Sequence, residues 1–147
     1  MESLKNEVKK RNSKRNLLNA DYMFNYASGI NLIVIDDKNI TDCFFVLSEP
    51  IQCFINGEAC DLPKSFFDND RLISKNNFLE RFLGLNIINW KKIYDPIDLR
   101  TVNIIWALII EFGGQGKYYK FSGLNAFPDE FGELLELMGI DSYALSN

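Results

Sequence analysis

The apolar run from Leu99 to Phe112, LRTVNIIWALIIEF, constrains the fold most, because a segment this hydrophobic must be largely buried. Its polar and small residues recur at spacings of three and four, which is the period of a helix. Asp98 can cap the start of such a helix, Pro96 prevents an earlier start, and Gly113 can end it. We therefore predict a mostly buried central helix, with Trp106 in the core.

The same run is also rich in β-branched residues, which favour strands. The alternative is a hairpin in which residues 103–112 and 117–121 are strands joined by the glycine-rich turn GGQG at 113–116. We give the helix precedence because the spacing of the polar residues fits it.

Two earlier segments, Ile30–Ile35 and Ile40–Ser48, flank the turn sequence DDKN and have the composition of strands. Both are apolar at successive positions, so we expect them to lie centrally in a sheet that is covered on each side. The pair Asn56-Gly57 predicts a two-residue type I′ hairpin turn.

In the register of that hairpin, Cys53 faces Cys60, which puts two of the chain's three cysteines within disulfide reach. An odd cysteine count in a domain large enough to form a core indicates reduced thiols instead. No window is long and apolar enough to span a membrane, and the charged start lacks the apolar core of a signal peptide. These features predict a cytoplasmic protein without membrane contact.

Further elements are expected on either side of the central run. Helices are predicted after Ser74 and between Phe127 and Gly139, the second with one apolar stripe. Strands are predicted over 85–94 and 117–121. We therefore expect an α+β fold: a single domain whose antiparallel sheet of four to six strands packs against the central helix and an amphipathic C-terminal helix.

Charge divides the chain into two parts. Residues 1–16 carry a net charge of +4 and are expected to form a basic helix or arm. Residues 17–147, the predicted domain, carry −8, which gives the chain its overall charge of −4. A short docking helix is expected at 17–26. An acidic domain repels phosphate backbones and attracts basic surfaces, so the arm alone favours nucleic acid.

The residue types needed for common catalytic sites are missing or wrongly spaced. The chain has no histidine, which removes the most frequent general base and most zinc sites. The pairs Asp36/Asp37 and Asp68/Asp70 lack the spacing of a calcium loop. We expect neither enzymatic activity nor a metal or cofactor; a histidine-free hydrolase using Asp and Lys is the least favoured hypothesis.

A small, acidic, histidine-free α+β chain with 14% aromatic residues resembles the immunity proteins of bacterial polymorphic-toxin and contact-dependent growth inhibition systems. The resemblance implies a non-catalytic protein that caps a basic nuclease-type toxin through an acidic surface. Acidic secretion chaperones share this character and provide one alternative. A nucleic-acid-binding or regulatory module that uses the arm provides another, and the oligomeric state stays open.

A capping protein should present acidic groups around exposed aromatic anchors, because electrostatic complementarity steers association and aromatic side chains dominate interface energies. The predicted partner-binding residues are Asp36, Asp37, Asp68, Asp70, Tyr118, Tyr119, Asp129, Glu130, Glu133 and Glu136.

Overall fold

The computed structural model describes residues 26–95, 103–113 and 116–140, which form an α+β fold. Its main sheet contains seven strands: β1 (Ala27–Ile35), β2 (Ile40–Val46), β3 (Gln52–Ile55), β4 (Glu58–Cys60), β7 (Ile93–Tyr94), β8 (Ile105–Phe112) and β9 (Lys117–Leu124). The other described elements are η1 (Lys64–Phe66), β5 (Phe67–Asp68), β6 (Arg71–Leu72), α2 (Lys75–Leu83), η2 (Ile87–Asn89) and α3 (Phe131–Leu137).

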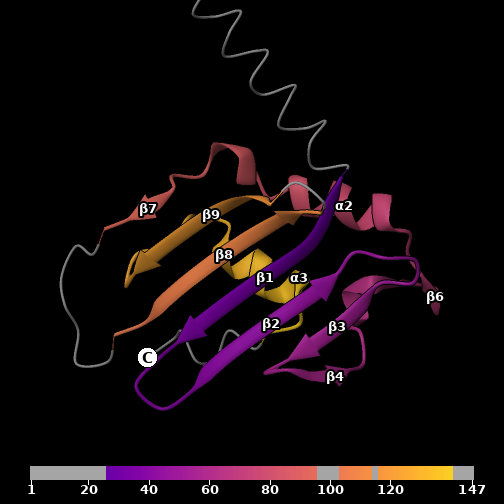
Figure 1. The fold of residues 1–147 in the computed structure, drawn as a ribbon, viewed down its shortest axis with the longest axis horizontal. Helices are drawn as coiled ribbons and strands as arrows, with labels where there is room; N and C mark the ends of the chain where they lie inside the picture. Colours follow the sequence, from indigo (N-terminus) through magenta and orange to yellow (C-terminus); the bar gives the residue numbers. More distant parts are fainter. Residues whose placement is uncertain (1–25, 96–102, 114–115, 141–147) are drawn as a thin grey trace, which may run out of the picture.

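The sheet has the strand order β4-β3-β2-β1-β8-β9-β7, so β1 and β8 lie side by side at its centre (Figure 1). Its strands pair in antiparallel fashion except β7, which runs parallel to β9. The α+β class is confirmed, whereas the expected antiparallel sheet of four to six strands is corrected to a mixed sheet of seven. β7 has only two residues, too few to show a period in the sequence.

The predicted central helix over Leu99–Phe112 is wrong, because the run is strand β8 from Ile105 onward. Positions four apart share a face in a strand as well as in a helix, so the spacing of Ala107 and Glu111 fits both. Burial follows the strand period of two, and β8 pairs with β9 as in the alternative hairpin. The buried side chains are Trp106, Leu108, Ile110 and Phe112.

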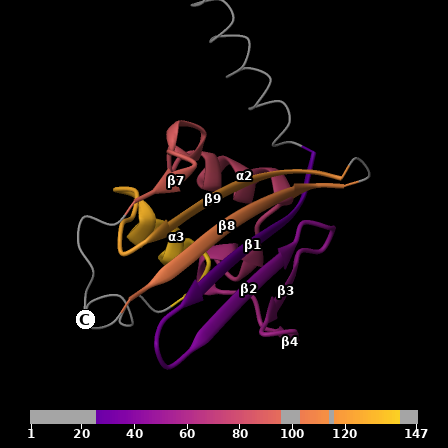
Figure 2. The same cartoon turned by 60° about the vertical axis from the view of Figure 1, so that its left-hand side comes forward.

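Both α-helices cover the same face of the sheet and lie behind it in Figure 1; Figure 2 shows them from a second side. Phe78 of α2 packs against Phe45 of β2 with ring centroids 6.2 Å apart. Phe131 of α3 packs against Trp106 of β8 at 4.8 Å. The hydrophobic core therefore lies between the helices and this one face.

Local signals in the sequence predicted both helices and the tight hairpin. The Ser74 hydroxyl accepts a hydrogen bond from the Asn77 backbone N–H at 3.1 Å, which caps α2. α3 is shorter than the predicted segment. Asn56 and Gly57 both have positive φ, as a type I′ turn requires, and the predicted pairing of Cys53 with Cys60 is confirmed.

The strand predicted over residues 85–94 is wrong for most of its length, because a single turn of 3-10 helix, η2, precedes the two residues of β7. Its apolar residues keep no period of two, since Ile87 and Trp90 are both buried three positions apart. The basic arm, the docking helix up to residue 25 and the cap at Asp98 lie outside the described residues. Within the described ranges, no helix has the length and hydropathy needed to cross a membrane.

Candidate protein-binding face

One face of the seven-stranded sheet is not covered by α2 or α3, and we call it the open face; it is turned toward the viewer in Figure 1. The strand register places alternate residues of six strands on it. They are Gly29, Asn31, Ile33, Ile35, Ile40, Asp42, Phe44, Val46, Gln52, Phe54, Ile93, Ile105, Ala107, Ile109, Glu111, Tyr118, Lys120, Ser122 and Leu124.

Large apolar side chains of the open face are exposed to solvent. The exposed fractions are 61% for Ile40, 66% for Ile93, 48% for Ile105 and 62% for Tyr118. The expectation that Ile30–Ile35 and Ile40–Ser48 are covered on both sides is therefore wrong, although β1 and β2 do lie inside the sheet. Several large apolar side chains left in water on one face are typical of a surface that binds another macromolecule.

Glu111 places its carboxylate over the backbone of Gly29 on the neighbouring strand β1. A Cβ built on Gly29 would lie 3.4 Å from Oε2 of Glu111 and 3.0 Å from Cε2 and Cζ of Phe44. On the other side, Glu111 pairs across the strands with Tyr118. The carboxylate thus lies near the Phe44 ring, and within the described part of the chain it forms no ion pair.

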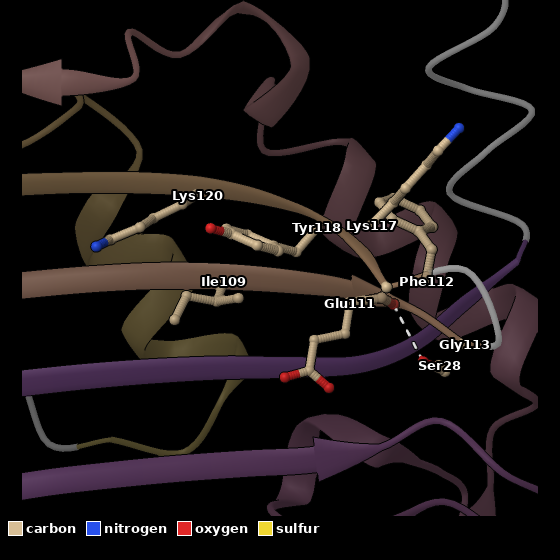
Figure 3. A pocket seen from close by; sticks show the side chains of 9 residues that line it. Ser28, Ile109, Glu111, Phe112, Gly113, Lys117, Tyr118 and Lys120 are labelled. Atoms are coloured by element: carbon tan, nitrogen blue, oxygen red, sulfur yellow. Dashed lines mark hydrogen bonds between the residues drawn. The ribbon is translucent and has the colours of Figure 1, made fainter.

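A hollow of about 520 Å³ lies at this end of the open face, where β8 and β9 approach their connecting turn (Figure 3). The Glu111 side chain extends from β8 toward β1, whereas Tyr118 lies along β9 in the direction of Lys120. Ile109 stands between Lys120 and Glu111 in this view. The Ser28 hydroxyl donates a hydrogen bond to the Glu111 carbonyl at 3.2 Å, which fixes the backbone under the hollow.

The edges of the sheet are less suited to bind a partner than its face. β4 has three residues and β7 has two, so each offers a short row of backbone groups. β9 pairs with β7 only at Ser122 and Gly123, and its remaining length carries Lys117 and Lys120. Lysines on an edge strand disfavour the addition of another strand.

The structure separates the acidic residues predicted at the interface into three places. Asp36 and Asp37 lie in the β1–β2 turn, Asp68 and Asp70 in or beside the β5–β6 hairpin, and Asp129, Glu130, Glu133 and Glu136 on or just before α3. Since α3 covers the opposite side of the sheet, its acids do not share a surface with the open face.

Several of these carboxylates have structural partners. Backbone N–H groups of Lys38 and Asn39 donate to Asp36 and hold the pKa of its carboxyl below the usual value. Asp68 forms an ion pair with Arg81 at 2.7 Å. Glu130 accepts a hydrogen bond from Nε1 of Trp90 at 3.1 Å. These three acids stabilise local structure whether or not they also contact a partner.

The two predicted aromatic anchors lie on opposite sides of the sheet. Tyr118 is exposed on the open face, as an anchor must be. Tyr119 points to the covered side, where it is half-buried and packs edge-on against Phe112 with ring centroids 5.4 Å apart. The expectation that Tyr119 is an exposed anchor is therefore wrong, because neighbours on a strand face opposite ways.

The three cysteines converge from adjacent strands on the covered side. The Cys60 thiol donates to the Cys53 sulfur at 2.7 Å, and Cys43 is fully buried beside them. Burial raises the pKa of Cys43 to about 12, and burial is also the main cause that raises the pKa of Cys53. Among the described residues, no group of three His, Cys, Asp or Glu side chains is arranged to hold a metal ion.

Comparisons with known protein families, with curated proteins and with solved structures give no match. The open face is therefore the feature that bears on function. Tyr118 was predicted from the sequence as a binding residue, whereas Phe44, Ile105 and Glu111, which share that face with it, were not. A strand reading of residues 105–112 puts Glu111 on the opposite side from Trp106, and this alternation would have indicated a solvated face.

Proposed function

We propose that the protein is a non-catalytic protein-binding module that neutralises a basic protein toxin by capping it, as immunity proteins do. The observation that carries this proposal is the open face, where Ile40, Ile105 and Tyr118 are exposed on a hydrogen-bonded sheet. A sheet face that exposes apolar and aromatic groups with charged groups among them has the composition of a protein interface.

Charge favours a basic partner. Residues 17–147 carry a net charge of −8, so the domain attracts cationic surfaces and repels nucleic acid. Electrostatic attraction of this kind speeds the encounter with a basic nuclease, and burial of the apolar face then slows dissociation. Capping blocks the substrate-binding surface of the nuclease domain, so the inhibitor needs no catalytic activity of its own.

The test measures binding of the full chain to a panel of basic nuclease toxin domains, and to short RNA and DNA, at physiological salt. Ile105→Lys places a cation on the open face at the start of the central strand β8, and we expect it to abolish capture of the cognate domain. Leu72→Lys is the matched control, because Leu72 is also an exposed large apolar residue, at 39%, but lies on β6 outside the open face.

A second comparison separates protein binding from nucleic-acid binding. Removal of residues 1–16, which carry the +4 balance, should leave toxin binding nearly unchanged. A nucleic-acid module would instead lose most of its affinity with those cations. Arm-dependent binding of RNA or DNA with no toxin domain captured would refute the proposal.

A further inference from the structure

We infer that Glu111 and Phe44 form a subsite for an arginine side chain of the partner, an inference that rests on the proposed function. The Glu111 carboxylate offers two acceptor oxygens, which match the paired N–H donors of a guanidinium group. Phe44 offers an aromatic face on which a planar cation can stack. A carboxylate beside an aromatic ring is thus suited to both the charge and the planarity of arginine.

Gly29 is the reason that this arrangement is possible. A Cβ at this position would lie 3.0 Å from two carbons of the Phe44 ring, closer than ordinary van der Waals contact. Without that carbon, the ring of Phe44 on β2 and the carboxylate of Glu111 on β8 both extend over the β1 backbone that separates their strands. The sheet itself therefore brings the two groups together.

The Glu111 carboxylate is free to accept a cation from outside. Lys120 also lies on the open face, but Ile109 stands between it and Glu111, and the two charged ends point in different directions (Figure 3). Lys117 points away from both. Asp42, by contrast, already accepts a hydrogen bond from the Asn31 amide at 2.5 Å. Glu111 is consequently the carboxylate of the open face that is best placed to pair with a partner.

Arginine is favoured over lysine at such a position. A guanidinium group is more weakly hydrated than an ammonium group, so it loses less hydration free energy on leaving water to contact the Phe44 ring. It can also keep both carboxylate oxygens paired while it stacks. The subsite should therefore prefer arginine to lysine and should discriminate strongly against a neutral analogue of the same shape.

The experiment uses three pentapeptide probes, acetyl-Leu-X-Leu-X-Leu-amide, in which X is arginine, lysine or citrulline, the uncharged isostere of arginine. Each is titrated into the full-length protein while backbone amide shifts are followed by NMR. We expect the arginine peptide to bind most tightly and to shift the amides of Gly29, Phe44, Glu111 and Tyr118. Glu111→Gln, which keeps the shape of the side chain, should weaken the affinity for the arginine peptide about five- to tenfold.

Glu136→Gln provides the matched control, because Glu136 is an exposed glutamate on α3, on the other side of the sheet. It should leave the affinity for the arginine peptide unchanged. Equal affinities for the arginine and citrulline peptides, no binding at 10 mM peptide, or a loss of affinity in Glu136→Gln instead of Glu111→Gln would each overturn the subsite.

The outcomes also separate this inference from the function on which it rests. If Ile105→Lys weakens capture of a toxin domain but Glu111→Gln does not, the subsite is refuted and the capping function is supported. If arginine binds selectively at Glu111 but no basic toxin domain is captured, the subsite is supported and the capping function is refuted.

Discussion

The indole ring of Trp106 lies against the backbone of Gly123, its cross-strand partner on β9, and leaves no room for a side chain there. A Cβ on Gly123 would lie 2.5 Å from both the indole Nε1 and the Ala126 carbonyl oxygen. These two atoms are joined by a hydrogen bond of 2.8 Å. The absence of a side chain at Gly123 therefore allows this hydrogen bond, which connects β8 to the segment leading into α3.

Gly123→Ala should destabilise the protein by about 1 to 3 kcal/mol, because the new methyl group must displace the indole ring or the Ala126 backbone. Urea denaturation measures the change. Gly132→Ala is the control: nothing lies within 4 Å of its Cβ position in α3, and helix propensity should stabilise that variant by roughly 0.5 to 1 kcal/mol. Equal effects of the two substitutions would contradict this account of Gly123.

Trp106→Ala should cost on the order of 3 to 5 kcal/mol of unfolding free energy, since the side chain is fully buried among aromatic rings. Ile105→Ala on the same strand faces the open side and should cost less than about 1 kcal/mol. A cost below about 1 kcal/mol for Trp106→Ala would disprove the central role of this residue in the core.

Stability should fall as the solution becomes alkaline. Burial raises the pKa of Cys43 from 9.0 to about 12, so above pH 9 the unfolded chain releases a proton that the folded chain retains. The free energy of unfolding should then decrease by up to about 1.4 kcal/mol per pH unit for this thiol. Denaturation between pH 8 and 10.5 should show a shallower slope for Cys43→Ala than for the unmodified protein, and identical slopes would exclude the effect.

All three cysteines should titrate as thiols when protein from a reducing cytosol is denatured without reductant. The domain buries enough apolar side chains to fold without a crosslink. The measurement is a thiol count with a chromogenic disulfide, combined with the intact mass. One thiol together with a mass 2 Da lower would reveal a Cys53–Cys60 disulfide.

The sequence predicted elements whose signals are local. Asn56-Gly57 determines its own turn, Ser74 caps its own helix, and the burial of Trp106 follows from its apolar surroundings. The central run was misassigned because spacings of four residues fit a helix and a strand equally well. Its pairing with β1, residues 27–35, favours the strand, and that contact is remote in sequence.

The candidate site was harder to predict than the fold. Its members come from strands that are distant in the sequence, so Phe44, Glu111 and Tyr118 show no common motif. The sequence suggested acidic and aromatic residue types as candidates but could not tell which side of the sheet would be covered. That depends on where α2 and α3 pack, which is a property of the tertiary structure.

The central pairing of β1 with β8 has a consequence for the order in which the chain folds. Leu32 lies beside Leu108 in the finished sheet, so their contact must close a long loop, whereas β1 to β4 can form by successive local hairpins. On the ribosome, the first four strands emerge well before β8. Until β8 is synthesised, the nine residues of β1 present an unpaired apolar edge to every other nascent chain nearby.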